Sequence, residues 1–255
     1  MGDISIRESI RWLPDAPSEP TSTIVLTSPE RRYVDIRILN PTTGNPIDED
    51  ATLPLSRLDW AIAGTSSSES CIDPSTGERH DDCKWRHWID SRTLDVENAT
   101  DEGKNYTVEG NPSLTLEKGS MVNPATGLVA EYEEVWRSEE IRTQVNGDYG
   151  PAQQQGKGIC VVLHLQGDES DGKVRRGSVI RLGRYCQAFA RKGDDIIVER
   201  HEWVSGKGWV SRVLINEGGL SVPTDFAMMV GEQANVDDEI VNDGDLWKVV
   251  EKLSV

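Results

Sequence analysis

Apolar and polar residues alternate along most of this chain, in short runs with a period of two. This is the period of a β-strand, in which successive side chains point to opposite faces of the sheet. Clusters such as NPTTGNP and NPATG separate the runs and are typical of turns. The pattern predicts strands at residues 21–28, 31–39, 57–65, 83–91, 105–110, 113–119, 128–137, 159–167, 178–191, 195–204, 208–215 and 245–253.

A helix is predicted at one place, a short one within residues 221–233. Many short strands at close spacing favour an antiparallel barrel or sandwich over an α/β fold. The polar, Gly- and Gln-rich residues 143–158 interrupt the strands and are typical of a linker. We therefore predict an all-β protein made of two tandem antiparallel β-barrels, residues 1–145 and 157–255, with a linker at 146–156.

Four short motifs stand out along the chain: WAIAGT at Trp60–Thr65, WID at Trp88–Asp90, EVW at Glu134–Trp136 and IRLGRYCQAF at Ile180–Phe189. Together these motifs resemble the fungal HRI family. The resemblance implies that both predicted barrels are lipocalin-like. It also implies two different functions, because the yeast member of the family interacts with a casein kinase, whereas a similar group of fungal proteins are biosynthetic pericyclases. Those pericyclases are hetero-Diels–Alderases that join a tropolone-derived quinone methide to a terpene to give a meroterpenoid.

The charge of the chain limits its partners. The 255 residues carry a formal net charge of −17, which opposes binding to nucleic-acid phosphates and to anionic lipids. We therefore expect neither a nucleic-acid nor a membrane partner, while a protein partner with a basic surface and a role in solubility alone are both compatible with this charge. Residues 1–17 lack the apolar core of a signal peptide, and no run reaches the ~20 apolar residues of a membrane span. A cytoplasmic location is expected, and no feature predicts the oligomeric state.

The segment CKWRHWIDS, residues 83–91, suggests a ligand pocket inside the first barrel. Alternate residues of a barrel strand face its interior, and the alternate set without permanent charge is the better candidate for that face. Applied to three strands, this rule predicts the interior side chains Trp60, Trp85, His87, Ile89, Tyr132, Glu134 and Trp136. Aromatic walls with a few polar groups are typical of small-molecule pockets, although the same side chains could simply fill a core.

The resemblance to the pericyclases would make this pocket the active site of a cofactor-independent cyclase. Such a cycloaddition needs a shaped, desolvated mould and a hydrogen-bond donor, and no metal or redox cofactor. The predicted residues that bind the small apolar substrate are Trp60, Trp85 and Trp136 in the first barrel, with Arg184 and Gln187 in the second.

The predicted catalytic residue is His87, assisted by Glu134 or Tyr132. Together they would transfer the proton that expels water from a hydroxymethyl precursor. The alternative is a non-catalytic protein that binds a small ligand or a casein-kinase partner. The sequence holds neither a nucleophile elbow nor a nucleotide-binding glycine loop.

A metal site is the remaining interpretation of the region around CKWRHWIDS. Cys71, His80, Cys83 and His87 form the pattern C-x8-H-x2-C-x3-H, whose donor types suit zinc. The first spacing is unusual, and a strand would turn His87 away from Cys83. We therefore expect no metal and no cofactor, and we expect the two other cysteines of the chain to be buried thiols.

Overall fold

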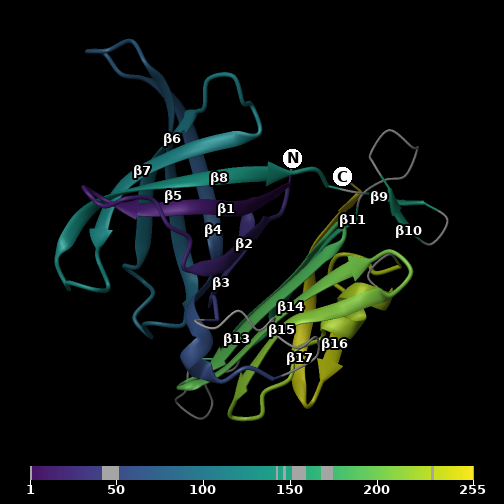
Figure 1. Cartoon of the computed structure of the whole chain (residues 1–255). Helices are drawn as coiled ribbons and strands as arrows, with labels where there is room; N and C mark the ends of the chain where they lie inside the picture. Colours follow the sequence, from purple (N-terminus) through teal and green to yellow (C-terminus); the bar gives the residue numbers. More distant parts are fainter. Residues whose placement is uncertain are drawn as a thin grey trace.

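The first half of the molecule is a closed antiparallel barrel of eight strands (Figure 1). The computed structural model describes residues 2–41, 52–141, 143–145, 148–150, 159–167, 175–230 and 233–254. The barrel strands are β1 (Asp3–Trp12), β2 (Thr21–Thr27), β3 (Arg32–Leu39), β4 (Leu58–Ile72), β5 (Arg79–Asp90), β6 (Thr100–Thr107), β7 (Leu114–Val122) and β8 (Val129–Glu139). Each strand pairs with the next along the chain, and β8 closes the barrel by pairing with β1.

The second half is an antiparallel sheet in the order β15-β14-β13-β12-β11-β17-β16. Its strands are β11 (Ile159–Leu165), β12 (Arg175–Leu182), β13 (Tyr185–Lys192), β14 (Asp195–Val204), β15 (Gly208–Glu217), β16 (Glu239–Asn242) and β17 (Asp245–Ser254). Two short pieces, β9 (Thr143–Val145) and β10 (Asp148–Gly150), pair with each other between the two halves. The predicted all-β class is confirmed, and the first unit is the predicted antiparallel barrel. The second unit, also predicted to be a barrel, is an antiparallel sheet of seven strands.

The outer face of the barrel packs against the second sheet. One apolar core contains Val34, Ile36 and Ile38 from β3 together with Ile180 and Phe189 from β12 and β13. The alternate residues of β3 point into the barrel and are polar or charged. The strand is therefore buried on both faces, with its apolar side chains outside the barrel and its polar ones inside.

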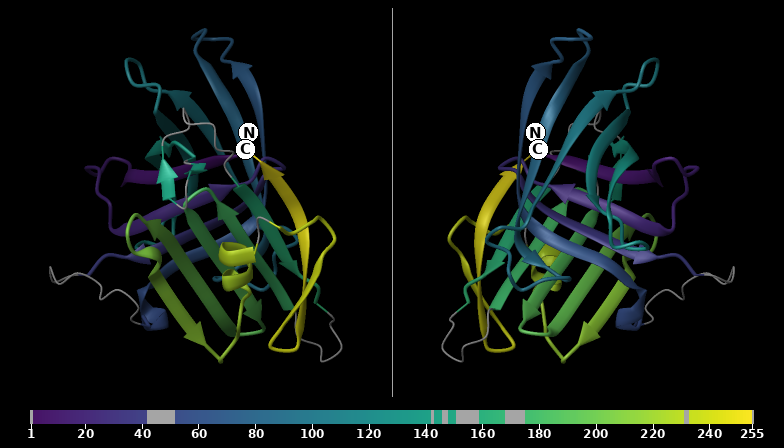
Figure 2. Two further views of the ribbon diagram at one scale, coloured as in Figure 1. Left: turned by 90° about the vertical axis from the view of Figure 1, so that its right-hand side faces the viewer. Right: turned by 90° about the vertical axis from the view of Figure 1, so that its left-hand side faces the viewer.

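The second sheet is also covered on its other face. The helical turn η2 (Phe226–Val230) lies there, within the predicted 221–233 segment, and Ala227 and Met228 join a second apolar core with Trp247. Figure 2 shows this turn on the face of the sheet that points away from the barrel, and it shows the N- and C-termini side by side. Among the described residues no helix is long and apolar enough to cross a membrane.

Most predicted strands are present, with three instructive differences. The predicted strand 178–191 is a hairpin, because Gly183 takes a positive φ of 56° and turns the chain between β12 and β13. Strand β1 was not predicted, because a bulge between Arg7 and Ser9 breaks its alternation. The barrel lies within residues 3–139 and the second sheet within 159–254; of the predicted linker, 148–150 are strand β10, and 146–147 and 151–156 lie outside the described residues.

Candidate functional site

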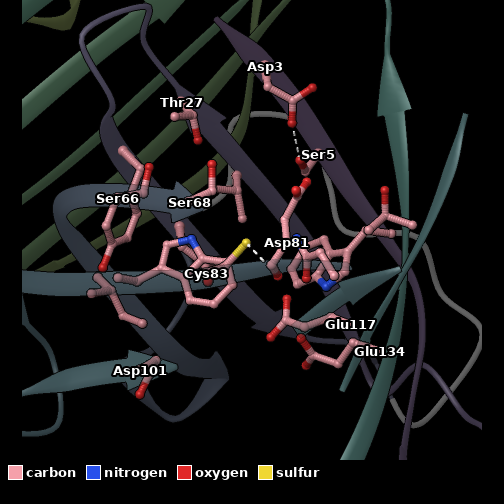
Figure 3. A pocket seen from close by; sticks show the side chains of 18 of the residues that line it. Asp3, Ser5, Thr27, Ser66, Ser68, Asp81, Cys83, Asp101, Glu117 and Glu134 are labelled. Atoms are coloured by element: carbon pink, nitrogen blue, oxygen red, sulfur yellow. Dashed lines mark hydrogen bonds between the residues drawn. The ribbon is translucent and has the colours of Figure 1, made fainter. Parts of the chain in front are cut away.

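A cavity of about 280 Å³ lies inside the first barrel (Figure 3). Its wall contains four large aromatic side chains, Tyr33, Trp85, Tyr132 and Trp136. The charged side chains of the wall are Asp3, Arg31, Asp35, Arg37, Asp81, Asp101, Glu117 and Glu134. Six of these eight are acidic, so the wall combines aromatic surface with an excess of negative charge.

Two arginines neutralise the innermost carboxylate, Glu134. The guanidinium of Arg7 lies 2.5 Å from Oε1 of Glu134, and that of Arg37 lies 3.6 Å from the same atom. Arg37 also donates to Asp35 at 2.9 Å, and Arg7 donates to Glu19 at 2.8 Å. Both arginines are buried. Burial would by itself lower the pKa of Arg7, but Glu134 and Glu19 raise it, so the guanidinium stays charged.

Glu117 is a second buried carboxyl, directly opposite Glu134 on the neighbouring strand. Figure 3 shows both side chains pointing into the same space. Burial, followed by the negative charge of Glu134, raises the pKa of Glu117 to about 8. The hydroxyl of Tyr132 donates to Glu117 at 2.8 Å. It can reach this position because Gly119 lies beneath it, where a Cβ would approach the hydroxyl to 2.5 Å.

Glu117 is therefore a neutral acid at neutral pH. The Glu134 carboxyl group beside it lies against two guanidinium groups. A carboxyl group that stays neutral at pH 7 can serve as a general acid. Sequence reasoning missed Glu117, because its strand carries Leu114 and Leu116 on the outward face, and apolar residues were expected to face inward.

Several buried polar atoms of the wall lack a hydrogen-bond partner among the described residues. They are the hydroxyl of Tyr33, Oδ1 of Asp35, Oδ1 of Asn105 and Nε1 of Trp136. An unpaired buried polar group costs about 1–3 kcal/mol. Burial and the nearby carboxylates raise the pKa of Tyr33 well above its usual value, so its hydroxyl is a donor. Two donors and two acceptors on residues that line the cavity therefore have no partner among the described residues.

His87 lies in the barrel interior but is already fully engaged. Its Nδ1 lies 2.8 Å from Asp90 and its Nε2 lies 3.3 Å from Asp101. The indole of Trp60 donates to the same Asp90 at 2.8 Å and meets the His87 ring edge-on. His87 and Trp60 therefore lie beside the cavity in a structural network, and neither lines it. Trp60 and His87 do contact each other inside the barrel. Of the site residues predicted in the first barrel, Trp85, Tyr132, Glu134 and Trp136 line the cavity.

The inward face of β5 changes register at a bulge. The predicted interior residue Ile89 lies in the core outside the barrel, and Asp90 takes the inward position. The bulge lies opposite the Ala63–Gly64 step of β4. Gly64 is required there, because a Cβ would lie 1.9 Å from the backbone oxygen of Arg86. The strict alternation used for the prediction fails at this point.

His87 makes the stability of the protein depend on pH. Burial by itself would lower the pKa of His87, but the hydrogen bonds and charges of Asp101 and Asp90 raise it to about 9. Its contribution is therefore complete below about pH 6.5 and is lost as the pH rises through 9. We expect His87→Ala to cost on the order of 2 kcal/mol of unfolding free energy at pH 6 and clearly less at pH 9.5. Urea titrations at the two pH values measure this difference, and an equal cost at both would contradict the ion-pair role.

The two residues predicted in the second unit, Arg184 and Gln187, do not line the cavity of the first barrel. Gln187 is fully buried between the two units, where it donates to the backbone oxygens of Ile24 and Val34. Arg184 lies in the tight turn and forms ion pairs with Glu139 and Glu202. Their contacts join strands of the two halves, so both act as structural links in this arrangement.

The predicted metal pattern is divided between two faces of the β4–β5 hairpin. Cys83 lines the cavity and His87 points to the barrel interior. Cys71 and His80 are cross-strand neighbours on the opposite, outward face. The four residues therefore do not form one site. In this region β4 and β5 continue beyond residue 66 as one long hairpin, with residues 73–78 at its turn.

Comparison with known proteins identifies a family and a similar fold, but it indicates no activity. The HRI1 family, described as Protein HRI1, matches residues 3–251. A crystal structure of an uncharacterised protein, YLR301w from Saccharomyces cerevisiae, is similar with a TM-score of 0.68 and 16% identity, covering 99% of both chains. No curated protein matches the sequence. At this identity the structural likeness concerns the fold alone.

Proposed function

This chain belongs to the HRI1 family, and we propose that it binds a compact aromatic ligand, neutral or cationic, inside the cavity of its barrel. The observation that carries the proposal is the set of unpaired polar atoms in the cavity wall. Buried polar groups in native proteins are almost always hydrogen-bonded to protein, water or ligand. Two donors and two acceptors on residues that line one cavity are therefore candidate groups for recognising a ligand.

The size of the cavity limits the ligand. A volume of about 280 Å³ lies just below the roughly 300–1,000 Å³ of pockets that hold drug-sized molecules. Trp85 and Trp136 supply flat apolar surface, on which an aromatic ring packs well. A single ring with one or two polar groups fits these dimensions better than a long fatty acid does.

The charge of the wall selects against anions. Six acidic side chains face two arginines, and Arg37 is already paired with Asp35. Adding a carboxylate or phosphate would place like charges close together in a poorly solvated space, which is unfavourable. A cation would instead be attracted to the carboxylates and to the faces of the aromatic rings.

Three matched probes test this selectivity. Tyramine, 4-ethylphenol and 4-hydroxyphenylacetate share a phenol ring and differ in being cationic, neutral and anionic. By isothermal titration calorimetry at pH 7.5 we expect tyramine to bind best and the anion to bind at least about tenfold more weakly, a difference of ~1.4 kcal/mol. Equal binding of cation and anion, or tighter binding of the anion, would refute the proposed ligand class.

A matched pair of variants tests the location. Trp136→Phe removes an unpaired donor from the wall and should weaken tyramine binding several-fold. Trp203→Phe, in the second sheet beside Trp209, should leave binding unchanged. Equal effects of the two substitutions would place the ligand elsewhere.

A second candidate function is the cofactor-independent cyclase implied by the resemblance to fungal pericyclases. The observation that favours it is the neutral acid Glu117 in the wall of the cavity. A protonated carboxyl can donate its proton to a leaving hydroxyl group, which departs as water, and the quinone methide forms as the ring hydroxyl loses its proton to solvent. On this proposal Glu117, rather than His87, is the acid. Product formation from a hydroxymethyl tropolone and a terpene should then fall at least ~100-fold in Glu117→Gln, and an unchanged rate would exclude this role.

A further inference from the structure

Three metal-ligating side chains come together on the outer face of the β4–β5 hairpin, away from the cavity. Cys71 on β4 pairs directly with His80 on β5, and Asp82 follows two residues later on the same face. One donor atom from each, a thiol sulfur, an imidazole nitrogen and a carboxylate oxygen, lies within 4.8 Å of the other two. The search that gives this cluster covers the described residues only.

The histidine of this cluster is held in place and incompletely paired. The side chain of His80 is only 4% exposed and stacks on Tyr106 with ring centroids 5.4 Å apart. Its Nε2 lies 3.2 Å from Asp82, while its buried Nδ1 has no hydrogen-bond partner among the described residues. An imidazole in this condition is poorly satisfied by the protein alone.

We propose that Cys71, His80 and Asp82 bind a divalent transition-metal ion of the zinc class. Zinc accepts sulfur, nitrogen and oxygen donors at about 2.0–2.3 Å, which places tetrahedral ligands roughly 3.5 Å apart. The present spread of up to 4.8 Å needs only rotation of Cys71 and Asp82, which lie at the surface. Three protein ligands leave the fourth position to water, as in open zinc sites.

Two features of the free protein oppose metal binding: the proton of the Cys71 thiol and the ammonium group of Lys104. Asp82 lies against the thiol, and the hydrogen bond between them raises the pKa of Cys71. Because zinc binds the thiolate, binding releases this proton and strengthens as the pH rises. The ammonium of Lys104 lies 4.0 Å from Asp82 and opposes an incoming cation.

This site is independent of the ligand proposed for the barrel. Asp81 and Cys83, the neighbours that alternate with its ligands on β5, point into the cavity instead. The same hairpin thus presents one face to the cavity and the other to the metal. Failure of metal binding would leave the proposed cavity ligand unaffected, and the reverse also holds.

The metal alone is the probe. The full chain, freed of metal with a chelator, is titrated with Zn²⁺ by calorimetry and with Co²⁺ by absorption spectroscopy at pH 7.5. We expect one ion per chain and a thiolate-to-cobalt charge-transfer band. Cys71→Ser should remove the band and weaken Zn²⁺ binding at least tenfold, as should Asp82→Asn, which leaves the buried His80 in place. Lys104→Met should strengthen binding.

Cys83→Ser is the matched control, because Cys83 lies on β5 together with His80 and Asp82 but faces the cavity. It should leave both the band and the zinc affinity unchanged. The proposal is overturned if wild type binds no Zn²⁺ with a defined stoichiometry. It is also overturned if Cys71→Ser and Cys83→Ser bind Co²⁺ with the same spectrum as wild type, since the metal would then lie on other carboxylates or histidines.

Discussion

Replacing Arg7 with Met is expected to lower the free energy of unfolding by about 3–5 kcal/mol, which is the usual cost of removing one partner of a buried ion pair. Both partners of the pair are almost completely buried, with side-chain exposures of 2% for Arg7 and 2% for Glu134. Without Arg7, Glu134 keeps only the more distant Arg37 at 3.6 Å, and Thr21 loses its hydrogen bond from the guanidinium. Urea-induced unfolding at pH 7 measures the loss.

The same two strands supply a matched control. Arg11 and Glu133 form an ion pair between β1 and β8 on the outer surface, where the arginine side chain is 37% exposed. Arg11→Met should cost less than about 1 kcal/mol, as is usual for exposed pairs. The double variant Arg7→Met, Glu134→Gln should recover much of the loss, because the almost completely buried charge of Glu134 is removed together with that of Arg7. The other partner of Arg7, Glu19, is partly exposed to solvent. Similar losses in Arg7→Met and Arg11→Met would contradict the buried network.

Replacing Glu117 with Gln is expected to stabilise the protein at alkaline pH. Because the pKa of Glu117 is raised to about 8 in the folded state, from an ordinary value of about 4.3, its contribution is fully favourable below about pH 4.3. That contribution is lost as the pH rises through 8, where folding must either bury a negative charge or keep a proton. Glutamine retains an oxygen that can accept from Tyr132 and carries no charge.

The variant should therefore exceed wild type by on the order of 2–4 kcal/mol at pH 8.5 and by much less at pH 4.5. Thermal and urea unfolding across this range give the difference directly. Glu133→Gln, on the outer surface of β8, is the control and should show no such trend. A constant difference between wild type and Glu117→Gln at all pH values would mean that Glu117 is ionised throughout.

The sequence was sufficient to predict most of the strands but not which face of each strand is the interior. In β3 the alternation of Tyr33, Asp35 and Arg37 with Val34 and Ile36 is plain. In an isolated barrel the apolar set would point inward. Here it points outward, because the second sheet buries it, and the polar set lines the cavity. The contact between the barrel and the second sheet determines which face of β3 points inward. The alternation of residues within β3 carries no information about that contact.

The candidate site was predicted only where the strands keep strict alternation. Trp85, Tyr132 and Trp136 were placed correctly, because their strands keep strict alternation through those positions. His87 was assigned to the right face, but its two carboxylate partners were not predicted, because their positions depend on the bulge after Ala63. Glu117 was missed entirely, because Leu114 and Leu116 alternate with it and apolar residues were expected to face inward.

We expect a cationic aromatic ligand to bind in the barrel cavity next to Glu117. The pH dependence of tyramine binding tests this directly, because the affinity then follows the protonation of Glu117. A cationic ligand prefers the ionised carboxylate, so the Kd should fall about tenfold per pH unit up to pH 8 and become constant above it. In Glu117→Gln the Kd should be independent of pH over this range. If wild type also binds tyramine with a Kd that does not change between pH 6 and 8.5, Glu117 does not face the ligand and the account of the cavity is wrong.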